Sequence, residues 1–115
     1  MERPPQQIDQ LKKLCRRLSS LRETDVTVYV MEGLRLPAGC EPSACDALLW
    51  PTARDGYPTR LFLSVRPKSP FQPNWNGATR IGARNWEAYS RNGISPDLTL
   101  AQIVVAHLDG LVRDK

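Results

Sequence analysis

The chain has 115 residues, of which 41% are hydrophobic and 24% charged, and its formal net charge at pH 7 is +4. These values fit one globular domain with its own core, and they exclude a disordered, collagen-like or coiled-coil chain. No apolar run is long enough to span a bilayer, and the first residues lack the apolar stretch of a signal peptide. We therefore expect a cytoplasmic protein that makes no membrane contact.

The positive charge is concentrated near the N-terminus. Residues 1–22 contain six basic and two acidic side chains, which account for +4, while the ten basic and ten acidic residues that follow cancel. Because most of the chain is balanced, no nucleic-acid-binding surface is predicted. Lys12, Lys13, Arg16 and Arg17 form the densest basic group. We interpret them as a docking surface for an acidic partner, the alternative being an ordinary solvated helix face.

The cysteines do not suggest a disulfide framework or a metal site. Cys15, Cys40 and Cys45 are odd in number, which favours free thiols in a cytoplasmic chain. Cys40 and Cys45 are five residues apart without further cysteine or histidine ligands nearby, so we expect no zinc. The chain also lacks a glycine-rich phosphate loop and a serine nucleophile motif, so no cofactor is expected.

The first half of the chain predicts a helix followed by three strands. Residues 1–7 hold two prolines without periodicity, which we interpret as a flexible tail. Runs of β-branched or apolar residues predict strands at 26–31, 46–50 and 59–65, the first ended by Gly33. Between residues 8 and 22, apolar side chains recur at helical spacing and predict an amphipathic helix: Ile8, Leu11, Leu14, Cys15, Leu18 and Leu21.

The second half predicts a loop, a short hairpin and a closing helix. Prolines at 67, 70 and 73 predict an extended loop, and Asn76-Gly77 predicts the turn of a hairpin between residues 75 and 81. Trp86 and Tyr89, three residues apart, suggest one buried helical turn.

The closing helix has the clearest start signal in the sequence. Thr99 with Gln102 three residues later predicts a capping box at its first turn. His107, the single histidine, lies beside the apolar stripe of this helix, and we interpret it as a core residue.

Two short segments carry a family resemblance, namely Ser-Pro-Phe-Gln-Pro at 69–73 and Ile-Ser-Pro-Asp-Leu-Thr-Leu at 94–100. Together with the order of helix, strands and capped helix, they resemble the ubiquitin-conjugating-enzyme superfamily. The resemblance implies an α+β, UBC-like fold over residues 8–115: an N-terminal helix, an antiparallel β-meander of three to four strands and a C-terminal helix. Arg84, Trp86, Tyr89 and Ser90 also resemble divergent bacterial members, which are associated with ubiquitin-like protein conjugation and antiviral defence.

The family's catalytic thiol has no counterpart in this sequence. Matching Gln72-Pro73-Asn74 to the family's His-Pro-Asn tripeptide leaves Asn74 as the possible oxyanion donor and places the expected thiol position at Gly82. A rival alignment lacks the tripeptide altogether. Both alignments end without a cysteine, and glycine cannot form a thioester.

Three functional hypotheses follow. The first is a non-catalytic UBC-like protein that binds a ubiquitin-like protein or an activating enzyme through its basic residues. The second is an active conjugating enzyme, transferring a thioester, whose thiol is atypical or replaced in this sequence. The third is an unrelated α+β interaction module. In the first case the segment from Trp75 to Tyr89 needs no reactive pocket, and we expect Trp86 to be buried between this segment and the closing helix.

Overall fold

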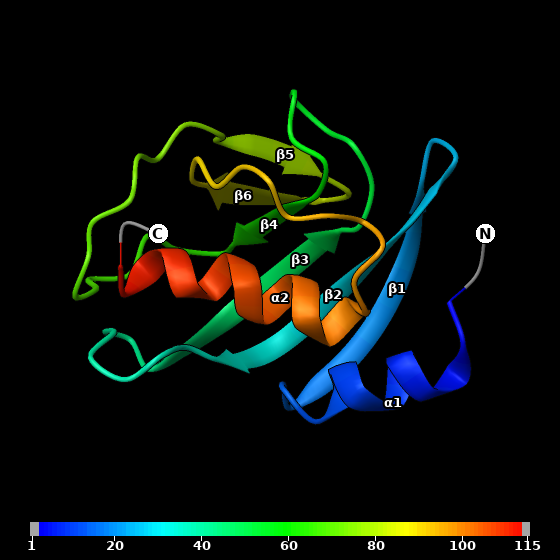
Figure 1. Cartoon of the computed structure of the whole chain (residues 1–115), viewed down its shortest axis with the longest axis horizontal. Coiled ribbons are helices and arrows are strands. Elements are labelled where there is room, and N and C mark those ends of the chain that lie inside the picture. The colour runs from blue at the N-terminus through cyan, green and yellow to red at the C-terminus, as the bar shows by residue number, and fades with distance from the viewer. Residues whose placement is uncertain (1–2, 114–115) are drawn as a thin grey trace.

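The protein is an α+β fold of two helices and a curled antiparallel sheet, seen in a computed structural model that describes residues 3–113. The sheet has six strands where three to four were expected, in the order β1-β2-β3-β4-β6-β5. Both helices lie on one side of the sheet (Figure 1). The elements are α1 (Pro5–Lys12), β1 (Arg17–Glu23), β2 (Val26–Arg35), β3 (Ala44–Trp50), β4 (Arg60–Leu63), β5 (Thr79–Ile81), β6 (Arg84–Ala88), α2 (Leu100–Leu108) and the 3-10 turn η1 (Asp109–Leu111).

The expected helix over residues 8–22 is wrong beyond Lys12, because residues 17–23 form an edge strand. Leu18 and Leu21, which would share a helix stripe, lie on opposite faces of this strand and pack against different core clusters. Ser19 and Ser20 between them are weak helix formers, so pairing with β2 decides the conformation. At the other end, α1 begins at Pro5, inside the segment where a tail was expected; residues 1–2 lie outside the described range.

The three expected central strands are present as β2, β3 and β4. Gly33 does not end β2 as expected. Its positive φ of 67° accompanies a register shift between Met31 and Leu34, after which pairing with β3 resumes. The N–H of Gly33 donates to Asp46 Oδ1 at 2.9 Å, which fixes the irregularity to the neighbouring strand.

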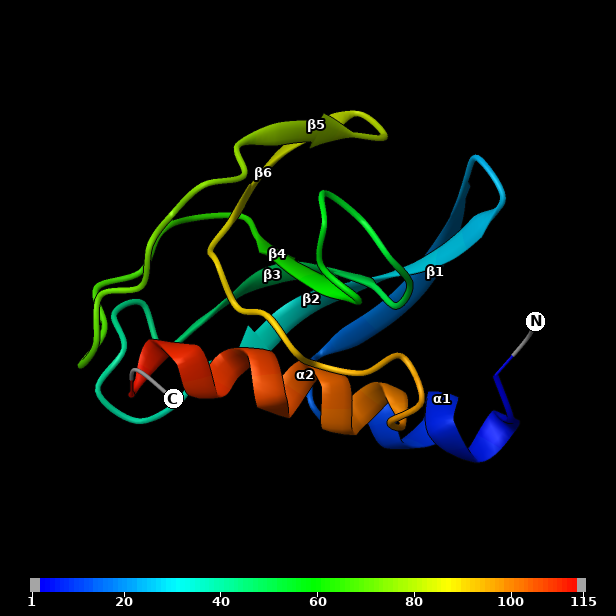
Figure 2. The same ribbon diagram turned by 45° about the horizontal axis from the view of Figure 1, so that its top comes forward.

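The curled sheet encloses two apolar clusters, one on each face. On the helix side, β2 to β4 pack against α1 and α2 through Leu11, Met31, Leu49, Leu61, Leu63, Leu100, Ile103 and Val104. On the other side, the β5–β6 hairpin curls back over the sheet (Figure 2) and closes a second cluster of Val28, Leu48, Trp50, Phe62, Ile81, Trp86 and Ala88. All four residues of β4 are therefore buried.

The second hairpin differs from the one predicted. Its turn is at Gly82, with φ of 61°, and not at Asn76-Gly77. Gly77 serves a close approach instead, since a Cβ there would lie 2.8 Å from Nη2 of Arg60. Trp86 is a strand residue, not part of a helical turn. It is buried as expected, but its cluster contains sheet and hairpin residues and none from α2.

The closing helix and its histidine match the sequence prediction. Thr99 and Gln102 form the capping box at the start of α2. His107 is 2% exposed, and its Nε2 lies 3.0 Å from Oγ1 of Thr59. The Thr59 hydroxyl donates its one proton to the carbonyl of Ile94 at 2.9 Å, so it accepts from a neutral Nε2–H imidazole. His107 is thus a satisfied core residue.

Candidate functional site

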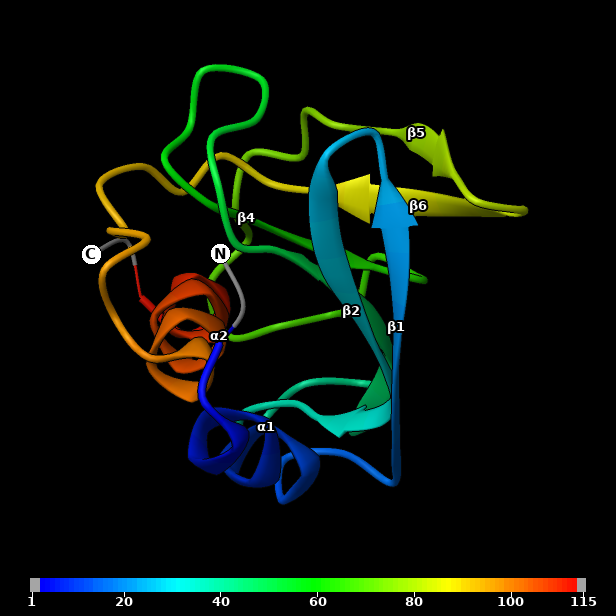
Figure 3. The same cartoon turned by 90° about the vertical axis from the view of Figure 1, so that its right-hand side faces the viewer.

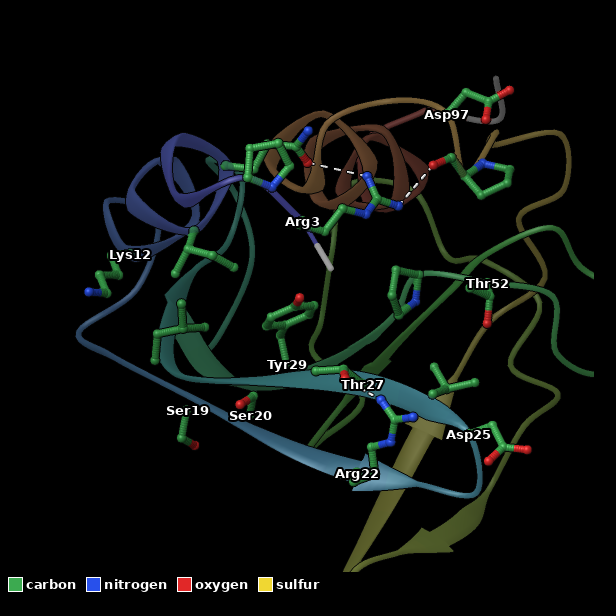
Figure 4. A pocket seen from close by; sticks show the side chains of 17 residues that line it. Arg3, Lys12, Ser19, Ser20, Arg22, Asp25, Thr27, Tyr29, Thr52 and Asp97 are labelled. Carbon is green, nitrogen blue, oxygen red and sulfur yellow. Dashed lines mark hydrogen bonds between the residues drawn. The ribbon is translucent and has the colours of Figure 1, made fainter. Parts of the chain in front are cut away.

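A groove of about 720 Å³ lies between α1 and the β1–β2 hairpin. Figure 4 shows that its floor is made by the paired strands, with Ser20, Arg22 and Tyr29 directed into it. One wall is α1, and the opposite wall consists of residues 51–52 and 96–97. Its lining combines hydroxyl groups and cations with apolar side chains and with two carboxylates, those of Asp25 and Asp97.

The walls of the groove are held together by the N-terminal segment. Arg3 donates from Nη1 to the carbonyl of Leu98 at 2.9 Å and from Nη2 to that of Pro96 at 2.8 Å. The side chain of Gln7 accepts from the backbone N–H of Leu100 at 3.1 Å. Because these bonds join α1 to the start of α2, the groove is a built feature of the fold.

The predicted basic residues lie beside this groove but do not share a helix face. Lys12 ends α1, Lys13 and Arg16 occupy the connection, and Arg17 begins β1; all four are exposed. Lys12 also lines the groove. The structure therefore brings them together along a bend of the chain, because the helix on which they were expected stops after its first two turns.

The charge of this region is not neutralised within residues 3–113. Residues 12–22 contain five cations, Arg22 included, and no acidic side chain. None of the five forms an ion pair, whereas the six ion pairs of the described chain all use arginines from Arg54 onward. Even Glu32, which pairs with Arg17 across the β1–β2 ladder, makes no ion pair with it. The basic residues remain available to an acidic partner.

The two positions that the family resemblance assigns to catalysis are not brought together. Gly82 sits exposed at the β5–β6 turn. Asn74 is also exposed, but it lies at the opposite end of the hairpin from Gly82, next to the bridge between Trp75 and Tyr89. Its backbone carbonyl accepts a hydrogen bond from the N–H of Ser90 at 2.8 Å. The two therefore form no reaction site with each other.

The three thiols are poorly suited to nucleophilic chemistry. Cys40 and Cys45 are buried in the helix-side cluster, and Cys15 is half-buried beside it. Burial raises the pKa of all three thiols, and for Cys45 this outweighs the hydrogen bonds from Ser64, which lower it. The thiolate, which is the attacking species in thioester formation, is disfavoured in each case.

We expect slow alkylation of Cys40 and Cys45 in the folded protein near neutral pH. Because both are buried with a raised pKa, their reaction with iodoacetamide should be at least about tenfold slower than in the urea-unfolded chain. Mass spectrometry of timed, quenched samples measures this site by site. Labelling of either residue as fast in the folded state as in urea would contradict the prediction and favour the thioester-forming alternative.

A buried arginine network was missed by sequence reasoning. Arg60 is 3% exposed, and it donates from Nη1 to Asp55 Oδ2 at 2.8 Å and from Nη2 to Oδ1 of Asn76. Its guanidinium lies 4.5 Å from the ring centre of Tyr57, whose hydroxyl contacts Asn76 and Ser90. Hydrogen bonds with Ser90 and then Asn76 lower the pKa of Tyr57. The network links the segment before β4 to the two segments that flank the β5–β6 hairpin. In the sequence, the signal for it was Arg60, a charged residue within an apolar strand pattern.

Within residues 3–113 no group of three or more His, Cys, Asp or Glu side chains is placed to hold a metal ion. None of the described helices combines the length and the apolar character needed to cross a membrane. Comparison of the chain with protein-family models, with curated proteins and with solved structures gave no match.

Proposed function

We propose that the protein is a non-catalytic, UBC-like binding module that recognises a ubiquitin-like protein or an activating enzyme through an acidic surface. The observation that carries the proposal is the group of un-neutralised cations beside the groove, Lys12, Lys13, Arg16 and Arg17. The order of helix, antiparallel meander and capped helix supports it, since that order underlies the resemblance to conjugating enzymes. The bacterial conjugation or antiviral-defence setting rests on the resemblance alone.

A binding role also agrees with the chemistry of the thiols and of the turn at Gly82. A conjugating enzyme needs an accessible thiolate with an amide donor near it. Here Cys40 and Cys45 are buried with raised pKa, and the expected thiol position is a glycine in a tight turn. These features favour binding over thioester transfer.

Neutralising the four cations should weaken partner binding while leaving the fold intact. In the variant Lys12→Gln, Lys13→Gln, Arg16→Gln, Arg17→Gln, each lost charge pair at the surface is worth about 0.2–1 kcal/mol, so we expect affinity to fall by about tenfold or more. Co-elution and titration with a ubiquitin-like protein and with an activating enzyme from the same genome measure the effect. Binding of the unchanged protein should also weaken as salt is raised, because salt screens exposed charges.

The matched control is Lys68→Glu with Arg80→Glu. Both positions are exposed, neither forms an ion pair within the described chain, and the double change brings the net charge from +4 to 0, as the fourfold change does. We expect this control to bind as the unchanged protein does. Failure of the unchanged protein to bind either partner, or an equal loss in both variants, would refute the proposal.

A further inference from the structure

The strand β1 is a free edge of the sheet. It pairs with β2 on one side only and stands at the end of the strand order. Figure 1 shows the β1–β2 hairpin at the right-hand margin of the molecule, and Figure 3, which faces that side, shows β1 in front of the other strands. Seven residues long, β1 exceeds the three-residue β5, so it is the edge with enough length to pair with another chain.

The backbone of β1 offers hydrogen-bonding groups outward at every second residue. Thr24 and Asp25 connect the strands, so Glu23 and Val26 close a two-residue hairpin and exchange hydrogen bonds. Alternation then directs the N–H and C=O of Arg22, Ser20 and Leu18 away from β2. Residues 18–23 make no backbone hydrogen bond outside this ladder within the described chain.

The charge along this edge selects the kind of chain that could pair with it. Two cations, Arg17 and Arg22, lie on the strand, and three more lie just before it: Lys12, Lys13 and Arg16. The strand itself has one acidic residue, Glu23. A second copy paired antiparallel about Ser20 would place Arg17 opposite Glu23, but it would also bring together two edges that each carry a net positive charge over residues 12–23, which disfavours self-pairing. An acidic segment would meet opposite charge at Arg17 and Arg22 and at the three cations that precede the strand.

Alternate side chains of β1 point to the face of the sheet on which the groove lies. Leu18, Ser20 and Arg22 line it and pair across the ladder with Met31, Tyr29 and Thr27. Arg22 is held in place by a 3.1 Å hydrogen bond from Nη1 to the hydroxyl of Thr27. A strand added outside β1 would therefore direct alternate side chains toward the groove's rim and toward Lys12.

We propose that an acidic, extended segment of a partner protein adds to β1 as a seventh strand. Backbone hydrogen bonds to Leu18, Ser20 and Arg22 would supply affinity, and the cations would supply selectivity. This inference rests on the proposed binding function and deepens it, because it specifies the conformation and charge of the partner segment. Docking of a folded acidic surface on the same cations, without strand pairing, is the competing outcome.

The test uses the whole protein and three fluorescein-labelled heptapeptides. The probe is fluorescein-Glu-Val-Glu-Val-Glu-Val-Glu-amide, the charge control replaces glutamate by lysine, and the backbone control is the acidic peptide with every amide nitrogen methylated. Fluorescence anisotropy at low ionic strength should show saturable binding of the acidic peptide. Loss of two or more backbone hydrogen bonds should weaken the methylated peptide by about tenfold or more. The lysine peptide should show no saturable binding.

Protein variants locate the site. Arg17→Glu with Arg22→Glu should weaken the acidic peptide by about tenfold, whereas Lys68→Glu with Arg80→Glu, which changes the net charge equally, should bind normally. In amide hydrogen exchange followed by NMR, bound peptide should slow exchange at Leu18, Ser20 and Arg22. The N–H of Leu21, already paired with β2, should change little.

Each outcome decides the inference. Equal binding of the acidic and methylated peptides, or no added protection at the three amides, would overturn strand addition. No binding of the acidic peptide, or a dimer of the protein formed through β1, would also overturn it. In all these cases co-elution with a ubiquitin-like protein or activating enzyme that is lost in the fourfold neutralised variant would still support the proposed function, so the two failures are distinguishable.

Discussion

Trp86→Ala is expected to lower the free energy of unfolding by about 3–5 kcal/mol, the usual cost of emptying a buried tryptophan site. The side chain is 1% exposed and packs with Val28, Leu48 and Phe62 on the sheet face opposite the helices. Its indole N–H donates to the carbonyl of Ile81 at 3.4 Å, so the ring also links the two strands of the β5–β6 hairpin. A loss of this size is a large part of the total stability of a small domain.

Urea unfolding at 25 °C measures this loss, and Trp75→Ala is the matched control. Trp75 is half-buried and packs edge-on against Tyr89, with ring centres 5.1 Å apart. Its removal should cost less than that of Trp86, because part of its surface already meets water. If the two alanine variants are equally stable, or Trp86→Ala matches the unchanged protein, the second cluster does not close the hairpin onto the sheet.

Acidification is expected to destabilise the protein through His107. Burial, with smaller effects of the charges on Arg91 and Arg60, lowers the pKa of His107 from 6.5 to about 3. The unfolded chain therefore takes up the imidazole proton first as pH falls. Stability should be unaffected by this residue above about pH 7, then fall between about pH 6.5 and pH 3, with about 2 kcal/mol lost by pH 5.

The control for the acid effect is His107→Gln, which retains an N–H donor for Thr59 but does not titrate. The difference in unfolding free energy between the unchanged protein and this variant should shrink as pH falls from about 7 to 5, since only the histidine form loses stability through this group. A difference that stays constant over this interval would show that folding does not lower the pKa of His107.

The elements that the sequence predicted correctly have signals confined to neighbouring residues. The capping box of Thr99 and Gln102 lies within one helical turn, and the apolar runs of β2, β3 and β4 have no competing helical periodicity. The core position of His107 followed from the same helix. The α+β class could be predicted from these parts alone.

The groove could not be predicted, because it depends on where α1 ends and β1 begins. Leu11, Leu14, Leu18 and Leu21 fit a helix stripe, and only pairing with β2 turns the last two onto opposite faces of a strand. The basic residues were found from charge alone, but their arrangement around a bend and beside an open edge required the tertiary structure.

The sequence by itself determined the closing helix, the central strands, the concentration of positive charge and the lack of a thiol at the expected position. Only the tertiary structure decided the second hairpin. Asn76-Gly77 has the stronger local turn signal, yet Gly77 is needed where Arg60 approaches, and the turn falls at Gly82. Local propensities are worth at most about 1 kcal/mol per residue, whereas burying Trp86 and Ile81 against the sheet contributes several, so long-range packing selects the register.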